Sequence, residues 1–342
     1  MRMERVSGRG ISPRAEPPVR TQRVGWLGIG VLLALGALAA GATVAGDAPL
    51  IAPPGAAMRA VAITFDDLPA TRHGRLDDVR GITLDLLAHL EKLAIPATGF
   101  VNENKLEVPG EEIARQAFLE AWLDAGHDLG NHTYSHRRLY DTPLAEVQAE
   151  VLRGERVTRR LLAARGRTPR YFRHPTLNTG PDLATKVAFE KFLTEHGYAV
   201  APVTIDNDEY LYAAAYDRAR ARRERAVQQR LGRDYLRYMS EVFDFYERLS
   251  RRLFEREIAQ ILLLHANALN AEYLDVLAAM MRARGYRFIT LDQALSDPAY
   301  RSPDTTIGPR GPSWLQRWAI TRGEEPGEQP KVPDWVRQAA EP

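Results

Sequence analysis

The sequence predicts an α/β protein built on a parallel sheet. Short apolar runs rich in β-forming residues alternate with segments of helical periodicity along most of the chain, which is the pattern of repeated β/α units. The first run, 61–65, has the sequence VAITF, and in the next segment, 82–93, leucines recur at helical spacing. Both a barrel and an open sheet fit this alternation, and in both the functional groups gather at the carboxyl ends of the strands.

The remaining elements follow in the same order. We expect further strands at 98–101, around Leu129, and at 171–172, 200–205, 261–264 and 286–291. Helices are expected between them at 113–125, 143–165, 182–196 and 271–284. The segment 215–258 breaks the rhythm, because it is one long helical stretch or a helix pair with an apolar stripe and twelve arginines on its other faces. We interpret it as a solvated helical insertion that docks through its stripe; the alternative is a partner- or membrane-binding role.

The two ends of the chain differ in composition from its middle. Residues 24–46 contain no charge and follow six arginines, so 1–46 is expected to be a signal peptide, the interpretation we favour, or an N-terminal membrane anchor. Either one implies export, to the periplasm, the exterior or an anchored position at the cell envelope. A linker is expected at 47–58, and a tail at 298–342 contains eight of the 22 prolines and three of the five tryptophans. We expect the tail to pack on the domain or to be partly mobile, with a tryptophan platform for sugar rings as the minority interpretation.

Composition excludes several classes of function. The net charge is +2, and the first 23 residues alone carry six arginines against two glutamates, which leaves −2 for the rest of the chain. The main body therefore lacks the basic surface that nucleic-acid binding requires. The chain has no cysteine, which excludes disulfides, cysteine-ligated zinc and thiol nucleophiles.

Two carboxylates and two histidines follow predicted strands. Asp66 and Asp67 are adjacent in TFDDLP, and in an extended chain they would point in opposite directions, one toward a metal and the other toward a substrate. Alone, such a pair is more often a turn or a helix cap. His132 and His136 are four residues apart and would lie on one face of a helical turn, which presents two nitrogen ligands to one Zn²⁺. With a carboxylate they form a set that leaves positions open for water and substrate.

Two later strand ends add groups suited to hydrolysis. Arg173 and Pro175 lie in RYFRHP, where a guanidinium can hold a carboxylate ionised and oriented. His265 follows the apolar run ILLL. A single histidine at a strand end is usually structural, but beside the other groups it suits a general acid because its pKa lies near working pH.

The order of these motifs resembles the polysaccharide deacetylase family, also called the NodB homology domain or carbohydrate esterase family 4. The resemblance covers about 59–297 and rests on TFDD-x-P, the paired histidines, R-x-P, an Asp-rich strand end and L-x-x-H. It implies a distorted (β/α)7-type barrel, here with a helical insertion. It also implies a metal-dependent hydrolase that removes acetyl groups from an acetylated glycan, such as an N-acetylhexosamine polymer of the peptidoglycan or chitin type. The implied metal is zinc, with cobalt or another divalent ion as alternatives.

The resemblance also implies roles for individual residues. Asp66 would be the catalytic base oriented by Arg173, and His265 would be the general acid. The metal would be held by Asp67, His132 and His136. The substrate would contact Pro175, Glu209, Tyr210, Leu263 and Leu264, with the two leucines near the acetyl methyl group.

One motif departs from the family pattern. Where the family commonly has Asp-Trp, with the aspartate holding the catalytic histidine, this chain has IDNDEY at 205–210. Glu209 aligns best with that aspartate, and Asp206 and Asp208 are the alternatives. The insertion lengthens the chain between this motif and His265. These differences leave the expected metal and catalytic set intact but alter the substrate cleft.

Two other functions stay open at this point. One is O-deacetylation or the hydrolysis of a small-molecule amide on the same fold. The other is a catalytically silent envelope protein that binds a glycan or a partner. A complete set of metal-binding and proton-transfer residues argues against the silent protein, and a metal assay separates the two, because stoichiometric zinc is expected only for an enzyme.

Overall fold

The structure is a computed structural model that describes residues 59–72 and 74–341. These residues belong to one compact unit of the chain, Ala52–Pro342. The expected signal peptide or anchor, 1–46, and the expected linker, 47–58, lie outside the described residues. Within the described ranges, no helix combines the length and the apolar character needed to cross a membrane.

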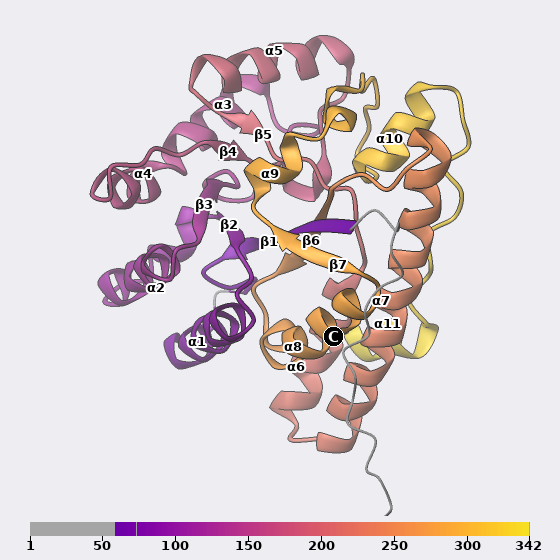
Figure 1. Cartoon of the computed structure of the whole chain (residues 1–342). Helices are drawn as coiled ribbons and strands as arrows, with labels where there is room; N and C mark the ends of the chain where they lie inside the picture. Colours follow the sequence, from indigo (N-terminus) through magenta and orange to yellow (C-terminus); the bar gives the residue numbers. More distant parts are fainter. Residues whose placement is uncertain (1–58, 73, 342) are drawn as a thin grey trace, which may run out of the picture. The chain divides into compact units, whose positions relative to one another are not determined.

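A parallel sheet of seven strands forms the centre of the described unit (Figure 1). The strands in chain order are β1 (Arg59–Leu68), β2 (Ala97–Val101), β3 (Asp128–Asn131), β4 (Tyr171–Phe172), β5 (Ala199–Val200), β6 (Gln260–His265) and β7 (Tyr286–Ile289). Their order in space is β5-β4-β3-β2-β1-β6, and β7 pairs with the first residues of β1 while β2 pairs with the last ones.

The sheet curls because its two ends approach each other. Past the short β5, Ile205 forms a parallel bridge with Leu262 of β6, so the strand expected at 200–205 is a two-residue strand followed by this bridge. The predicted α/β fold of the distorted (β/α)7-barrel type is confirmed. The carboxyl ends of β1, β3 and β6 therefore lie at one end of the curled sheet, where the expected site residues are.

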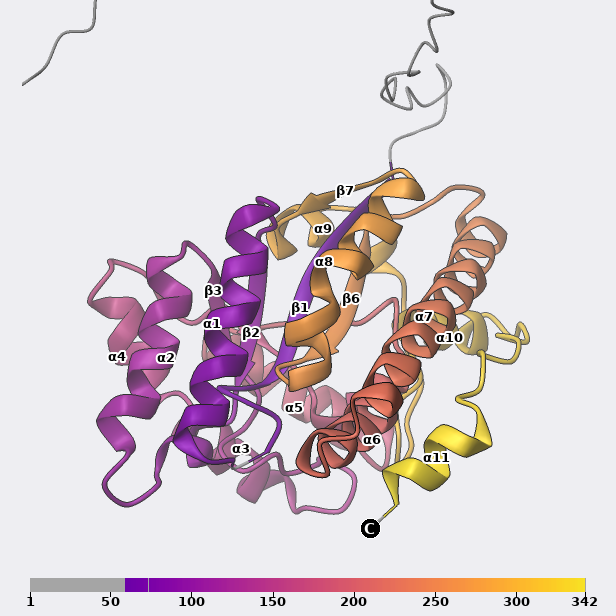
Figure 2. The same ribbon diagram turned by 90° about the horizontal axis from the view of Figure 1, so that it is seen from below.

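Helices surround the sheet (Figures 1 and 2). They include α1 (Leu76–Lys92), α2 (Glu112–Asp124), α5 (Leu183–Glu195), α8 (Ala268–Ala283) and α9 (Leu291–Leu295). The single helix expected at 143–165 is instead two helices, α3 (Leu144–Arg153) and α4 (Arg156–Ala163). The break has a physical cause, since the buried carboxylate of Glu103 accepts hydrogen bonds from the backbone of Val157 and Thr158 at the start of α4.

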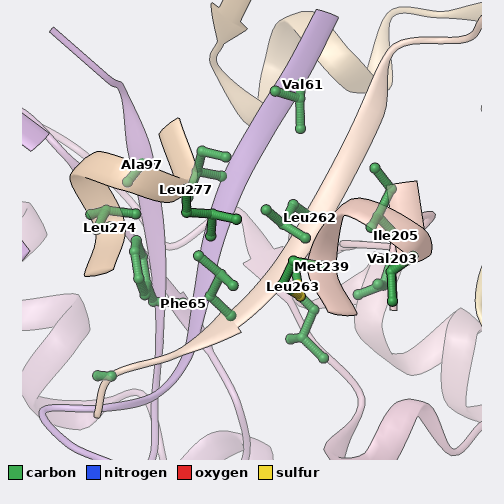
Figure 3. Close-up of a cluster of buried hydrophobic side chains, with 14 of the residues drawn as sticks. Val61, Phe65, Ala97, Val203, Ile205, Met239, Leu262, Leu263, Leu274 and Leu277 are labelled. Carbon is green, nitrogen blue, oxygen red and sulfur yellow. The ribbon is translucent and has the colours of Figure 1, made fainter. Parts of the chain in front are cut away.

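The largest apolar core lies around β1 and β6 (Figure 3). Val61 and Phe65 of β1 and Leu262 of β6 are buried together with Leu274 and Leu277 of α8. Side chains on both faces of β1 are buried, as expected for a parallel strand covered on two sides. This packing fixes β1 and β6 side by side, which sets the spacing of the groups at their carboxyl ends.

The helical insertion is a helix pair that begins earlier than expected. Helix α6 (Glu209–Ala221) and helix α7 (Arg225–Phe254) take the place of 215–258. The apolar stripe of α7 is buried, including Tyr235, Met239 and Val242. The insertion thus docks through its stripe, and its first residue, Glu209, is itself fully buried.

The tail is part of the core rather than a loose extension. It forms a 3-10 turn (Pro298–Arg301) and the helices α10 (Trp314–Thr321) and α11 (Asp334–Ala340). Trp314 and Trp318 are buried in the main apolar core, so a tryptophan platform for sugar rings is wrong for these two residues. Sequence periodicity misses such helices because each spans only about two turns.

We expect Trp318→Ala to lower the free energy of unfolding by about 3–5 kcal/mol, because it would leave a cavity between α7 and the tail. The Trp318 ring packs edge to face on Phe254 and Tyr300, with centroids 5.5 and 5.6 Å apart. Urea unfolding measures the loss, and Trp335→Ala is the matched control at a partly buried position. A loss below about 1 kcal/mol for Trp318→Ala would contradict a tail built into the core.

Candidate active site

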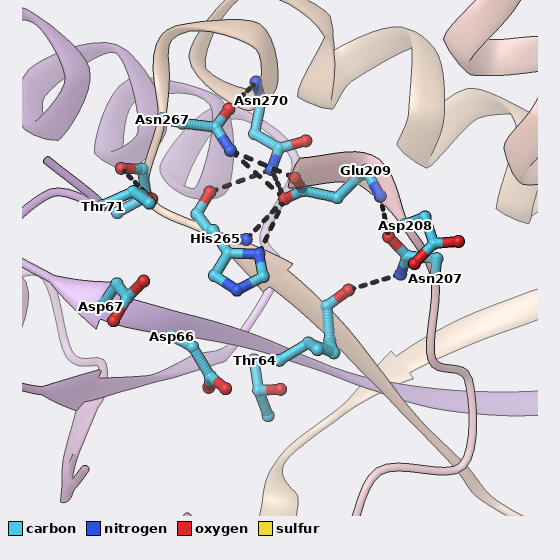
Figure 4. Close-up of polar contacts among 12 residues, drawn as sticks. Thr64, Asp66, Asp67, Thr71, Asn207, Asp208, Glu209, His265, Asn267 and Asn270 are labelled. Carbon is cyan, nitrogen blue, oxygen red and sulfur yellow. Dashed lines mark hydrogen bonds and ion pairs between the residues drawn. The ribbon is translucent and has the colours of Figure 1, made fainter. Parts of the chain in front are cut away.

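The end of β1 turns two carboxylates toward one cleft. The register between β1 and β2 shifts between Phe65 and Leu68, and Asp67 has a left-handed backbone with φ of 71°. These irregularities break the alternation of side chains, so Asp66 and Asp67 line the same cleft. The expectation that the two point in opposite directions is therefore wrong. Figure 4 shows both side chains on the same side of His265.

Arg173, just past β4, holds Asp66 in place. Its Nη1 donates to Asp66 Oδ1 at 3.1 Å, its Nη2 donates to Thr64 Oγ1 at 3.1 Å, and its Nε donates to Ala201 O at 2.8 Å. The guanidinium is fully buried. Burial raises the pKa of the Asp66 carboxyl, and the charge of Arg173 offsets only part of that increase. Asp66 is thus an oriented carboxylate with an increased affinity for a proton.

His132 and His136 lie on a loop after β3, so the helical turn expected there is wrong. Thr133 and His136 have left-handed backbones, with φ of 61° and 60°. Asparagine side chains stabilise this loop: Asn131 Oδ1 accepts from Thr133 N at 2.8 Å, and Asn102 Nδ2 donates to His132 O at 2.6 Å. The two imidazole rings still meet, with centroids 4.9 Å apart.

Hydrogen bonding decides which nitrogen of His132 faces the cleft. His132 Nδ1 lies 2.8 Å from the backbone oxygen of Arg173. Because a carbonyl only accepts, Nδ1 carries the proton and Nε2 keeps a free lone pair. Burial lowers the pKa of His132 to about 4. Burial also lowers the pKa of His136 to about 4, and repulsion between the protonated forms of the two rings adds to that decrease. Both rings are neutral at pH 7, which is the form that binds a metal.

Three donor atoms converge in the cleft. Asp67, His132 and His136 each place one ligand atom within 4.8 Å of the others, and His136 Nε2 lies 3.9 Å from Asp67 Oδ1. Burial disfavours the charged form of Asp67, but Lys105 and the nearby histidines outweigh it and hold the pKa of Asp67 well below its usual range. One carboxylate oxygen and two neutral imidazole nitrogens fit a divalent cation of the zinc kind, so the donor set matches the metal implied by the sequence.

His265 ends β6 and contacts a buried carboxylate (Figure 4). Glu209 Oε1 lies 3.2 Å from His265 Nδ1, and it also accepts from His265 N at 2.8 Å and from Asn270 Nδ2 at 2.7 Å. Burial opposes a charge on His265, but Glu209 prevails and raises the pKa of His265 to about 9. The structure places Glu209, rather than Asp206 or Asp208, against this ring.

The cleft has a volume of about 320 Å³. Its lining consists of Asp66, Asp67, Thr71, His132, His136, Thr176, Leu177, Asp206, Asn207, Asp208, Tyr210, Leu263, His265, Arg310 and Gly311. Burial raises the pKa of Asp206, on this lining, to about 7.

Some expected substrate contacts lie at the cleft and others do not. Tyr210 and Leu263 are on its lining. Leu264 is buried in the core instead, because side chains alternate along β6 and His265 and Leu263 share the cleft side. Pro175 and Glu209 are buried and are not among the residues that line the cleft. A direct substrate contact is therefore wrong for Leu264, Pro175 and Glu209.

Sequence reasoning missed two cationic groups. Lys105 is buried with its Nζ 3.1 Å from Asp67 Oδ1, and no motif links these two residues in the sequence. Burial lowers the pKa of Lys105. Arg310 reaches the cleft from the tail, where the backbone of Gly311 donates to Thr176 O at 3.2 Å. Residues beyond the recognisable motifs gave no signal that they would return to the site.

Helix α3 supports the histidine loop from behind. Glu150 accepts hydrogen bonds from the backbone of Tyr134 at 3.0 Å and from Ser135 N and Oγ, each at 2.7 Å. Gly154, which follows α3, lies against the loop: a Cβ there would be 2.6 Å from Tyr134 N. The close approach of the two backbones requires a glycine at this position.

We therefore expect Gly154→Ala to displace the histidine loop, which would lower the melting temperature and weaken the binding of zinc, used here as a probe of the candidate metal site. Gly81→Ala is the matched control, because a Cβ at Gly81 on α1 meets nothing within 4 Å and alanine favours a helix. Thermal unfolding and a calorimetric zinc titration measure the two effects. Zinc binding by Gly154→Ala as tight as that of the unchanged protein would show that the loop does not depend on this contact.

Residues 55–198 match the family model described as Polysaccharide deacetylase. The match identifies residues 55–198 as similar to a polysaccharide deacetylase domain and supports a hydrolase of the deacetylase type. The matched segment contains Asp66, Asp67, His132, His136 and Arg173, whereas Glu209 and His265 lie beyond it.

Solved structures of similar fold are distant from this chain. A family 4 carbohydrate esterase from Streptomyces lividans, in complex with acetate, is 19% identical with a TM-score of 0.43, over 70% of this chain and 97% of that one. A family 4 acetyl xylan esterase from Clostridium thermocellum, in complex with a cobalt ion, is 21% identical with a TM-score of 0.45, over 70% and 91%. A CE4 family pseudoenzyme from Bacillus anthracis is 16% identical with a TM-score of 0.43, over 70% and 66%.

Proposed function

We propose that this protein is a metal-dependent deacetylase that hydrolyses the acetamido group of N-acetylhexosamine units in a glycan of the peptidoglycan or chitin type. The observation that carries the proposal is the convergence in one cleft of three metal-donor atoms, the oriented carboxylate of Asp66 and the imidazole of His265. Metal-assisted hydrolysis of an amide uses all of these groups. A protein that only binds a glycan needs none of them, which argues against the silent alternative.

Asp67, His132 and His136 would hold the cation, with zinc as the first choice and cobalt or another divalent ion as alternatives. When bound, such an ion supplies Lewis-acid chemistry, because it polarises a carbonyl group and makes a water molecule easier to deprotonate. Asp66 is placed to accept the proton of that water, since Arg173 orients it toward the cleft. Its raised pKa makes it a stronger proton acceptor.

His265 is placed to protonate the leaving nitrogen of the sugar. Its ring lines the cleft, and Glu209 keeps it protonated at neutral pH by raising its pKa to about 9. Leu263 gives the cleft an apolar contact for the acetyl methyl group. Tyr210 lies on the same lining with part of its ring exposed, where it can pack on a sugar.

We propose further that the protein is exported and acts at the cell envelope, in the periplasm, outside the cell or anchored to the membrane. The support for this is the uncharged segment 24–46 behind a cluster of arginines. A glycan of the envelope would then be in the same compartment as the enzyme.

Acetate release from chitooligosaccharides, peptidoglycan and acetylxylan tests the reaction itself. We expect release from the N-acetylated glycans, because His265 is placed to protonate an amine. Release from acetylxylan alone would contradict N-deacetylation and favour the O-deacetylase alternative. Release from none of the three would contradict glycan deacetylation, with a small-molecule amidase favoured if the protein holds stoichiometric zinc and the silent protein if it holds none.

We expect His132→Ala and His136→Ala each to lose both metal and activity while remaining folded, since two protein ligands are too few for a catalytic zinc. Asp66→Asn and His265→Ala should keep the metal but lose turnover by roughly 10²–10⁴-fold, the usual effect of a positioned proton-transfer group. Metal content and acetate release are measured on the same preparations. Full metal occupancy in either of the first two variants would refute the ligand assignment.

The pH–rate profile should lose activity on its basic side as His265 gives up its proton. The pKa of His265 is raised to about 9, so the protonated form of His265 predominates below that pH. The positive charge of a bound cation lowers this pKa and shifts the basic limb of the profile toward lower pH. Glu209→Gln removes the charge that raises this pKa and should shift the limb further toward acid pH. Asp208→Asn is the matched control. An unmoved limb in Glu209→Gln would mean that His265 is not the acid.

A further inference from the structure

A second, larger hollow adjoins the catalytic cleft described above. Its volume is about 640 Å³, against about 320 Å³ for the catalytic cleft. Thr71 lines both spaces, and Ala266 and Asn267, which directly follow His265, line the second hollow. Thr71 N and Oγ1 both donate to Ala266 O, at 2.9 and 3.2 Å. This contact fixes the boundary between the two spaces.

The far side of the second hollow comes from α1 and from the helical insertion. Asp78 and Val79 of α1 face Asp217 and Arg220 of α6 across it. Both helices pack against α8, which follows the loop after β6. The insertion therefore extends the surface next to the catalytic cleft, and because Thr71 lines both spaces a polymer bound at the cleft can continue into this hollow.

The second hollow carries an excess of positive charge. Its lining has three arginines, Arg72, Arg220 and Arg223, against two aspartates, Asp78 and Asp217. Arg72 Nε lies 3.7 Å from Asp217 Oδ2 and Arg220 Nη2 lies 3.7 Å from Asp78 Oδ1, which is too long for a hydrogen bond. The side chains of both arginines are about half exposed, which leaves donors of their guanidinium groups available.

Arg223 adds the third guanidinium from the turn between α6 and α7. It has a left-handed backbone with φ of 59°, and its side chain is exposed. Within the described part of the chain it forms no ion pair. The described residues therefore leave the positive charge that Arg223 places on the hollow without a paired carboxylate.

The catalytic cleft lacks this excess of positive charge, since Asp66, Asp67, Asp206 and Asp208 line it together with only Arg310 and His265. With a divalent cation held there, the formal charges of the cleft balance, so its centre suits a neutral acetylated sugar. An anionic group is favoured one position further on, among the arginines of the second hollow.

We propose that the second hollow binds the carboxylate of the sugar next to the acetylated one. The substrate is then a glycan in which carboxylate-bearing units alternate with N-acetylhexosamine, as in peptidoglycan strands whose stem peptides have been removed, rather than a neutral chitin-type polymer. Arginine suits this task because its planar guanidinium can donate two parallel hydrogen bonds to one carboxylate. This inference rests on the proposed function and narrows its substrate class.

The test compares two glycans on the full-length protein in detergent. The first is a set of peptide-free peptidoglycan strands, and the second is chitooligosaccharides of matched length. In the double variant Arg220→Gln/Arg223→Gln, we expect the KM for the peptidoglycan strands to rise about tenfold, the equivalent of about one charge-assisted hydrogen bond. The kcat for the strands and both constants for chitooligosaccharides should stay unchanged.

Arg222→Gln is the matched control, because Arg222 is exposed in the same turn but does not line the hollow. It removes the same charge and should leave the KM for both glycans as it is. An equal rise of KM for both glycans in the double variant, no rise at all, or a rise in Arg222→Gln as large as in the double variant would each overturn the subsite.

Binding without turnover separates this inference from the proposed function. Calorimetric titration with fully deacetylated peptidoglycan strands measures binding without turnover, and we expect the double variant to bind them about tenfold more weakly than the unchanged protein. Binding with no acetate release from any glycan would overturn the proposed function and leave the subsite standing. Acetate release, together with equally tight binding of the deacetylated strands by both proteins, would overturn the subsite and leave the proposed function standing.

Discussion

The geometry of the site depends on the hydrogen bonds of one buried residue, Arg173. Its side chain joins Asp66 and Thr64 of β1 to the segment after β5, and its backbone oxygen fixes the proton of His132 on Nδ1. A charge buried this completely is costly unless every donor has a partner. One residue therefore sets both the orientation of the proposed base and the nitrogen that His132 offers to a metal.

The insertion and the tail each contribute residues to the candidate active site. Glu209 is at once the first residue of α6 and the buried partner of His265, so the insertion and the proposed acid share one contact. The tail covers the other side of the cleft with Arg310 and Gly311, and its Trp318 is buried against α7. Packing energy in the core thereby fixes groups at the cleft that are far apart in the sequence.

Much of the fold was predictable from the sequence, because apolar periodicity and strand order depend on local patterns. The motifs likewise located Asp66, Asp67, His132, His136 and His265. What the sequence could not predict depends on backbone irregularity or on distant contacts. Asp67 and Thr133 have left-handed backbones where the sequence predicts an extended strand end and a helical turn, respectively. The contacts that bring Lys105 beside Asp67 and Arg310 to the cleft form only in the folded chain.

The most direct test of this account is the position of a bound ion. Anomalous diffraction at the zinc absorption edge, on crystals of the protein grown with zinc, should show one ion bonded to Asp67, to Nε2 of His132 and to His136. The ion must bond to Nε2 because Nδ1 carries the proton, which it donates to the backbone oxygen of Arg173. An ion at Asp206 and Asp208 instead, or no ordered ion at stoichiometric zinc, would contradict the metal centre on which the proposed chemistry depends.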